Sequence, residues 1–285
     1  MRSPKWLDHI LYPFDHHTTE LEHGTLHYVD EGDGEPIVFV HGTPTWSFVW
    51  RQQIKSLSRT HRCIAPDHLG FGLSDKPQDF AYTPEAHADN LELLIDRLKL
   101  KDITLVVHDF GGPIGLRYAI RHPENVKKLV ILNTWMWSLE PEVQMMKISK
   151  FLSGGIGRFL YLNMGFSARF LLPKGYSQRK YLTKDIYQHY LKPLSGAGSR
   201  LGTWHFAKAL SASNSYFAAL WNQHESIRQI PKLILWGEKD ALLPIHFLGK
   251  WESAFPEAEI HKIKAGHFLQ EEKGSEVTEA IKNFI

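Results

Sequence analysis

The chain has 285 residues, of which 43% are hydrophobic and 22% charged, the composition of an ordinary globular protein with a sizeable core. Its formal net charge of +2, with no clustered basic stripe, argues against nucleic acid as a partner. The single cysteine, Cys63, excludes an internal disulfide, and its apolar neighbours predict a buried, unreactive thiol. A chain of this length fits one large α/β domain, or one domain with an insert.

The chain begins with MRSPKWLDHILYPFDHH, which has no long apolar stretch followed by small residues, as a secretory signal would. No segment approaches the run of about 18 uncharged apolar residues that a membrane span needs. We therefore expect a cytoplasmic protein without a membrane partner, which exists as a monomer or a weak homodimer. No spacing of histidines and carboxylates matches a specific metal site, so neither a metal nor another cofactor is expected.

Short β-branched runs alternate with amphipathic segments along most of the chain. This pattern is typical of strands and crossover helices around a mostly parallel sheet, and it predicts an α/β fold. Ahead of these runs, GTLHYVDEGDGEP (residues 24–36) is typical of an antiparallel edge hairpin. The predicted strands are, in chain order, Pro36–Val40, Arg62–Pro66, Ile103–Val107, Leu129–Leu132, Lys232–Trp236 and a last one near Glu259–Ile263.

The alternation stops between Ser138 and Ile227. This segment is rich in Tyr, Phe, Leu and Gly, contains no convincing strand and is typical of several short helices. We therefore predict a helical cap, residues 138–227, over the carboxyl ends of the strands. Residues 1–137 and 228–285 are expected to form the main domain. Within the cap, LSGAGSRLG (Leu194–Gly202) predicts a flexible loop.

The most informative stretch is VVHDFGGP, in which an apolar strand ends in a histidine, Asp109 and, after Phe110, a glycine pair. Ligands of open α/β sheets bind outside the carboxyl ends of the strands, where Asp109 falls. Gly111 and Gly112 allow a tight turn from strand to helix, so the stretch is typical of a nucleophile elbow with aspartate in place of serine. The alternative is that Asp109 only caps the helix, and this stretch alone does not decide between the two.

Further polar residues follow predicted strands at the same edge of the sheet. Asp240, in GEKDALLP, comes just after one strand, and His267, in KAGHFLQEE, lies in the loop after the last one. The chain order nucleophile, acid, histidine is the order of α/β-hydrolase triads. The first parallel strand leads into HGTP, so the backbone N–H groups of Thr43 and Phe110 are predicted to form an oxyanion hole.

The sequence resembles the α/β-hydrolase superfamily, specifically the haloalkane dehalogenases, with epoxide hydrolases as close relatives. The resemblance rests on HGTPTWSFVWR, APDHLGFGLSDKP, ITLVVHDFGGPIGL, NTWMW, WGEKDALLP and AGHFLQEE, which span nearly the whole main domain. It implies an α/β-hydrolase fold, with a mostly parallel central sheet flanked by helices and an inserted helical cap. It also implies a cis peptide bond between Thr43 and Pro44.

An aspartate in the elbow implies a particular chemistry. A carboxylate is ionised at neutral pH and attacks a saturated carbon carrying a leaving group without help from a base. Asp109 would form an alkyl ester, and His267, oriented by Asp240, would then activate the water that hydrolyses it. The predicted function is therefore hydrolysis of a carbon–halogen bond in a small, neutral, apolar organic substrate. A serine in this position would instead indicate acyl transfer.

The leaving-group site departs from the pattern of the family. Haloalkane dehalogenases usually have a tryptophan directly after the nucleophile, whose indole N–H holds the halide, whereas Phe110 has no side-chain donor. Thr43 stands where an asparagine often supplies the second donor. The tryptophans that could substitute in the leaving-group pocket are Trp46, Trp135, Trp137 and Trp204. Trp135 is nearest the expected pocket, and core packing is the alternative role for each of them.

Two other functions stay open. An epoxide hydrolase would use the same triad and two cap tyrosines that protonate the epoxide oxygen, but no spacing singles out a pair. A non-catalytic hydrolase-fold protein would serve in binding or signalling, and the missing halide tryptophan is the reason to consider it. An anionic substrate such as fluoroacetate is not expected, because Phe110 and Pro113 supply no arginine beside Asp109. The cap tyrosines are Tyr161, Tyr176, Tyr181, Tyr187 and Tyr190.

Overall fold

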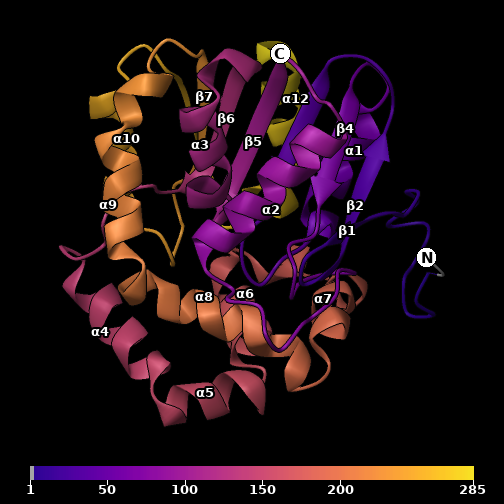
Figure 1. Ribbon diagram of the computed structural model, residues 1–285, viewed down its shortest axis with the longest axis vertical. Coiled ribbons are helices and arrows are strands. Elements are labelled where there is room, and N and C mark those ends of the chain that lie inside the picture. Colours follow the sequence, from indigo (N-terminus) through magenta and orange to yellow (C-terminus); the bar gives the residue numbers. More distant parts are fainter. Residues whose placement is uncertain (1–2) are drawn as a thin grey trace.

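The computed structural model describes residues 3–285, and its centre is an eight-stranded sheet (Figure 1). The strand order is β1-β2-β4-β3-β5-β6-β7-β8. β2 pairs antiparallel with β1 and β4, and all the other neighbouring pairs are parallel, so the expected mostly parallel sheet is confirmed. The strands are β1 (His17–Leu21), β2 (Gly24–Glu31), β3 (Pro36–Val40), β4 (Arg62–Pro66), β5 (Ile103–Asp109), β6 (Val126–Thr134), β7 (Lys232–Gly237) and β8 (Glu259–Ile263).

The central strands are apolar along their whole length because both faces of the sheet are covered by helices. In β5, Leu105 and Val107 belong to one hydrophobic core and Val106 to the other. Helices α2, α3 and α10 contribute to the first core, and α1 and α12 to the second, in which Cys63 is fully buried as expected. The helices are α1 (Arg51–Leu57), α2 (Pro84–Arg97), α3 (Gly111–Arg121), α10 (His246–Ala254), α11 (Leu269–Glu272) and α12 (Gly274–Phe284).

Between β6 and β7 the chain forms helices and turns without a strand, and all of these helices except the last lie together at the lower end of the molecule in Figure 1. Phe206 of this segment stacks on Phe110, which directly follows β5, so the helices approach the carboxyl ends of the parallel strands. The predicted boundaries of the cap, residues 138 and 227, stay a prediction. The helices are α4 (Val143–Ser153), α5 (Gly155–Leu162), a π-helical turn (Ser167–Leu171), α6 (Leu172–Gly175), α7 (Lys184–Leu191), α8 (Leu201–Ala212) and α9 (Asn214–Asn222).

Two local expectations were wrong. Residues 24–31 form one strand, β2, whose antiparallel partners are β1 and β4, so residues 24–36 are not a hairpin by themselves. The sequence of β1, HTTEL, is short and polar because this edge strand is only partly buried, and it therefore gives little signal. The segment Leu194–Gly202 is not a plain loop, because the buried Arg200 guanidinium inside it donates to the carbonyls of Leu162 and Leu194, and α8 begins at Leu201.

A buried ion pair joins α1 to α11 and to the cap. The Arg51 guanidinium donates to both carboxylate oxygens of Glu271, with an Nη2–Oε2 distance of 2.7 Å, and both side chains are buried. The hydroxyl of Tyr190, in the cap helix α7, donates to the same carboxylate. Because both side chains are buried, their two charges depend on each other for compensation.

Replacement Glu271→Gln is expected to lower the free energy of unfolding by about 3–5 kcal/mol, because Arg51 would stay buried without a charged partner. Urea unfolding followed by circular dichroism measures this change. The matched control is Glu35→Gln, which removes the exposed partner of Lys127 and should have a much smaller effect. An equal loss in both variants would contradict the idea that burial makes the Arg51–Glu271 pair costly to break.

Candidate active site

Asp109 lies on the sharp turn between β5 and α3. It is the last residue of the strand, and its φ of +54° places it in the left-handed region, which non-glycine residues seldom occupy. The turn needs glycine at the second and third residues after Asp109. A Cβ on Gly111 would lie 2.1 Å from the carbonyl oxygen of Val40, and a Cβ on Gly112 would lie 1.8 Å from Oγ1 of Thr134. The predicted strand-to-helix turn is therefore present, with the Asp109 side chain at its apex.

The loop after β3 holds one oxygen of this carboxylate. The Thr43 backbone N–H donates to Oδ1 of Asp109 at 2.7 Å, and the peptide bond between Thr43 and Pro44 is cis, as the family resemblance implied. Gly42 allows the approach, because a Cβ there would lie 2.1 Å from the same Oδ1. The Thr43 N–H, one of the two predicted oxyanion donors, therefore orients the Asp109 carboxylate in this structure. The oxyanion role of Thr43 and Phe110 stays a prediction.

His267 stands between two carboxylates that are far apart in the sequence. Its Nδ1 lies 2.7 Å from Oδ2 of Asp240, and its Nε2 lies 3.5 Å from Oδ2 of Asp109. The His267 side chain is fully buried, whereas that of Asp109 keeps an 11% exposed fraction. Oδ1 of Asp240 accepts the backbone N–H groups of Leu242 and Leu243, which fix its direction. The structure thus brings together the three side chains that the sequence predicts as a triad.

The two carboxylates control the charge of the imidazole. Burial alone would lower the pKa of His267, but Asp240 and Asp109 outweigh it and raise this pKa to about 10. Burial likewise opposes ionisation of Asp240, yet His267 and the two backbone N–H groups hold its pKa below the usual range. The two carboxylates therefore favour the imidazolium form of His267. Esterification of Asp109 would remove one of the charges that raise the His267 pKa.

Three further polar residues support the triad, and the sequence analysis gave them no role. Asn133, at the end of β6, donates from Nδ2 to Oδ2 of Asp240 at 2.7 Å and accepts the N–H of Gly237. The Thr134 hydroxyl donates to the backbone carbonyl of Asp109. Nε2 of His108 lies 2.9 Å from the backbone carbonyl of His267 and holds the histidine loop. The sequence did contain a signal for them, because each is a polar residue at the end of an apolar strand. Asn133 and Thr134 begin the stretch NTWMW, and His108 directly precedes Asp109.

The structure corrects the predicted donor roles of Trp46 and Trp204, whereas a role of Trp137 in the leaving-group pocket stays a prediction. The indole N–H of Trp46 donates to the carbonyl of His189 at 2.9 Å, and that of Trp204 to the carbonyl of Leu152 at 3.0 Å. Neither donor is free for a leaving group. Trp137 packs in an aromatic cluster with Trp221, Phe247 and Trp251, with ring centroids 5.2 to 5.3 Å apart. These three side chains stabilise the core because large aromatic rings bury the most apolar area.

Trp135 packs against Phe110, the residue after Asp109. Its ring meets that of Phe110 edge to face at 4.9 Å, and its buried indole N–H has no hydrogen-bond partner within residues 3–285. On its other side Phe110 stacks on Phe206 of α8, with centroids 4.4 Å apart. Aromatic rings therefore pack around Phe110, directly after Asp109.

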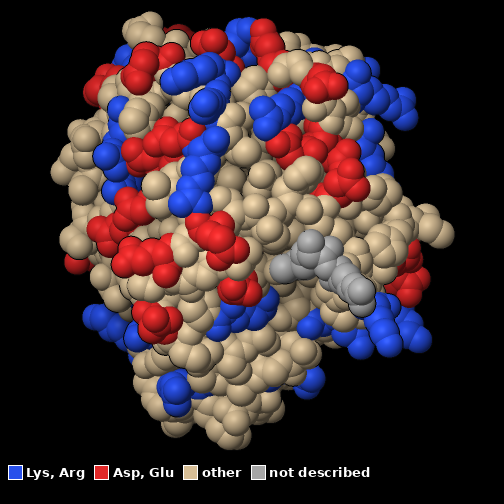
Figure 2. Space-filling model, turned by 45° about the vertical axis from the view of Figure 1, so that its right-hand side comes forward, with Lys and Arg blue, Asp and Glu red and all other residues tan. Residues whose placement is uncertain are grey.

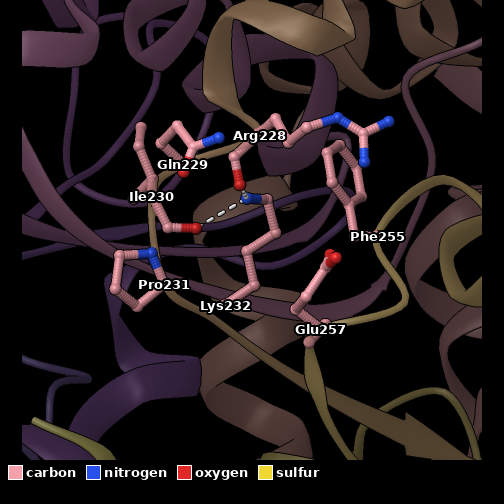
Figure 3. A pocket seen from close by; sticks show the side chains of 8 residues that line it. Arg228, Gln229, Ile230, Pro231, Lys232, Phe255 and Glu257 are labelled. Atoms are coloured by element: carbon pink, nitrogen blue, oxygen red, sulfur yellow. Dashed lines mark hydrogen bonds between the residues drawn. The ribbon is translucent and has the colours of Figure 1, made fainter.

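A cavity of about 220 Å³ outside this site lies at the amino end of β7, and Figure 3 shows the Lys232 ammonium there between backbone carbonyls. The ammonium donates to the carbonyls of Ile227 and Ile230, both at 2.6 Å, so its hydrogen atoms are already used. Because β5, β6 and β7 are parallel, this cavity lies at the amino ends of the strands, whereas Asp109 lies at the carboxyl end of β5. Lys232 therefore has a structural role.

Replacement Asp109→Asn should lower the pKa of His267 measurably below that of the unmodified protein, because one of two raising carboxylates is removed while burial is unchanged. Titration of the imidazole nitrogens by NMR measures it. Asp102→Asn is a matched control, since Asp102 has the same φ of +54° but lies outside the site. An unchanged His267 pKa in the Asp109 variant would mean that the Asp109 charge does not reach the imidazole.

Comparison with known proteins agrees with this arrangement. Residues 35–274 match the family model described as alpha/beta hydrolase fold. The chain is 38% identical to the cis-3-alkyl-4-alkyloxetan-2-one decarboxylase of Shewanella oneidensis, over 96% of this chain and 89% of that protein. It is 33% identical to haloalkane dehalogenase 2 of Mycobacterium bovis, over 96% of both. The structure of the haloalkane dehalogenase DatA from Agrobacterium tumefaciens matches with a TM-score of 0.80 at 26% identity, covering 94% of this chain and 95% of that one. The protein belongs to the α/β hydrolase fold family and is haloalkane dehalogenase-like in sequence and structure.

Proposed function

We propose that the protein is an enzyme in which Asp109 attacks a saturated carbon of an uncharged, apolar substrate and forms an alkyl ester. The observation that supports this most is the position of the carboxylate. Oδ1 is held by the Thr43 N–H, and Oδ2 faces His267 at the turn between β5 and α3. The aromatic rings of Phe110, Phe206 and Trp135 favour an apolar substrate, because they offer no hydrogen bonds to a polar one.

Within this chemistry we propose decarboxylation of an oxetan-2-one, a four-membered cyclic ester. The leaving group would then be a carboxylate that stays attached to the substrate. It needs no pair of indole donors, which agrees with Phe110 after the nucleophile. The imidazolium form of His267 would stabilise the new negative charge. The decarboxylase of Shewanella oneidensis, 38% identical, supports this substrate class.

The reaction proceeds in two steps without water. Asp109 attacks the saturated ring carbon that is bonded to the ring oxygen, and the bond between these two ring atoms breaks. The electron pair of that bond stays on the oxygen, so the substrate then carries a free carboxylate. That carboxylate then leaves as carbon dioxide, its bonding pair forms the carbon–carbon double bond, and the ester bond breaks to return the carboxylate of Asp109. An anion lies beside His267 in every state, so the imidazole has no need to lose its proton. Asp240 holds the ring in place through Nδ1.

Haloalkane hydrolysis is the second candidate, supported by the free indole N–H of Trp135 and by the 33% identical dehalogenase of Mycobacterium bovis. Here Asp109 would displace a halide, and His267, with its pKa lowered by esterification of Asp109, would take a proton from water.

The epoxide alternative loses support from the positions of the tyrosines. The Tyr190 hydroxyl donates to Glu271, and the Tyr187 hydroxyl donates to the carbonyl of Arg169. Tyr161 is buried in a small core inside the cap. The Tyr176 hydroxyl is buried and has no hydrogen-bond partner within residues 3–285. Of the cap tyrosines, Tyr187 and Tyr190 therefore have hydroxyls that are occupied elsewhere in the fold.

Asp109→Asn should reduce turnover of the true substrate at least about 1,000-fold, because an amide is a poor nucleophile. Asp102→Asn, with the same left-handed backbone, should keep full activity. Turnover is followed by gas chromatography of the alkene from a cis-3,4-dialkyl-oxetan-2-one and by bromide release from a 1-bromoalkane. Retained turnover in the Asp109 variant would refute the nucleophile.

Turnover in ¹⁸O-labelled water separates the two substrate classes. With an oxetan-2-one, the peptide containing Asp109 should gain no label, since no water attacks the ester. Haloalkane hydrolysis would instead place the label in the Asp109 carboxylate after several turnovers, because water attacks its carbonyl carbon. Mass spectrometry of the digested protein reads both cases. Labelled Asp109 during alkene formation would exclude the two-step decarboxylation.

A further inference from the structure

The positive charge of the protein is concentrated in one part of the chain. From α4 to α8, residues 143–212, there are eleven Lys and Arg and a single acidic residue, Asp185, a net charge of +10. The whole chain has a net charge of +2, so the remaining residues carry −8. In Figure 2 the lower end of the molecule accordingly shows Lys and Arg among uncharged side chains and no Asp or Glu on this face.

These cations are exposed and unpaired. Nine of the eleven are exposed, and within residues 3–285 none of the nine takes part in an ion pair. Elsewhere on the surface some cations have partners, as Arg62 has Asp30 and Lys127 has Glu35. The cap surface therefore presents positive charge that the protein does not compensate. The nine are Lys147, Lys150, Arg158, Arg169, Lys174, Arg179, Lys180, Lys184 and Lys192.

Large apolar side chains are exposed on the same surface. Phe151 of α4 and Phe159 of α5 have exposed fractions of 56% and 57%, and Ile156 reaches 65%. Both helices pack on α8 and form the outermost layer of the molecule at the lower end of Figure 1. Seven of the ten large exposed apolar residues in the described chain lie in this part: Val143, Ile148, Phe151, Ile156, Phe159, Met164 and Phe170.

We propose that the surface formed by α4, α5 and the π-helical turn, with its exposed cations, docks on a membrane that contains anionic lipids. Exposed phenylalanine and isoleucine side chains with lysines and arginines beside them are the combination that binds at a lipid interface. Nucleic acid would use the cations but leave the aliphatic side chains in water. Within residues 3–285 no helix is long and apolar enough to cross a membrane, so the contact is peripheral.

Flotation of the full-length protein with lipid vesicles tests this. Vesicles of phosphatidylcholine with about one third phosphatidylglycerol should bind the protein at low salt, and vesicles of phosphatidylcholine alone should bind it far less. Added salt should release it. Failure to bind the anionic vesicles at low salt would overturn the proposal, as would equal binding to both compositions.

Two variants and their controls locate the contact. Lys147→Gln, Lys150→Gln and Arg169→Gln combined should weaken vesicle binding about 100-fold, because each cation near an anionic surface contributes about fivefold. Arg59→Gln, Lys101→Gln and Lys282→Gln, exposed cations outside the cap, should leave it nearly unchanged. Phe151→Gln with Phe159→Gln should also weaken binding, whereas Leu93→Gln with Ile245→Gln, similarly exposed outside the cap, should not.

Thermal unfolding of each variant separates lost docking from lost folding. Because the replaced side chains are exposed, the unfolding temperature should not change. Binding that is equal in both cap variants and the controls would overturn the assigned surface. Binding of a DNA duplex that survives the phenylalanine replacements, without vesicle binding, would also overturn it and point to nucleic acid. The docking surface does not depend on which substrate Asp109 attacks.

Discussion

The site depends on the left-handed backbone of Asp109. A residue in this conformation costs about 1–3 kcal/mol and persists only where its surroundings hold it. Here the surroundings are closely packed, because Gly42, Gly111 and Gly112 each stand where a Cβ would overlap a neighbouring backbone or side-chain atom. The close approach lifts the carboxylate out of the sheet and places it within reach of the Thr43 N–H and of His267. The positions of the Asp109 carboxylate, the Thr43 N–H and His267 relative to one another thus follow from this one turn.

The charges of the site follow from that geometry. One imidazole lies between two carboxylates in a buried space, so its protonated form is favoured although burial opposes it. The state of Asp109 then decides the state of His267. A reaction that keeps an anion beside the histidine uses an imidazolium throughout, whereas a reaction that needs a base must first neutralise Asp109. The two proposed substrate classes differ in this respect. The missing side-chain donor on Phe110 favours the first, and the indole N–H of Trp135 favours the second.

The cap and the main domain differ in their electrostatics more than the composition indicates. A net charge of +2 is the sum of a strongly basic segment and an acidic remainder. The expectation of no basic cluster rested on the small net charge and on the absence of a basic stripe along the sequence. The cations are instead spread over some 70 residues and gather only when α4 to α8 fold into one end of the molecule. Electrostatic attraction between exposed charges acts over about 10 Å at 0.1 M salt. A charged partner is therefore attracted by cations that are close in space, whatever their separation along the sequence.

The sequence by itself determined the mostly parallel sheet, the turn at Asp109 and the order of the three predicted triad residues. Each leaves a local pattern: apolar runs for buried strands, glycines where the backbone leaves no room, and polar residues directly after the strands. Only the tertiary structure decided that Trp46 and Trp204 use their N–H groups on backbone carbonyls, that Asn133 holds Asp240, and that β2 pairs with β1 and β4. These contacts join residues up to 143 positions apart. A tryptophan in a core and a tryptophan at a site have the same neighbours in sequence, and only the fold brings a partner to the indole nitrogen.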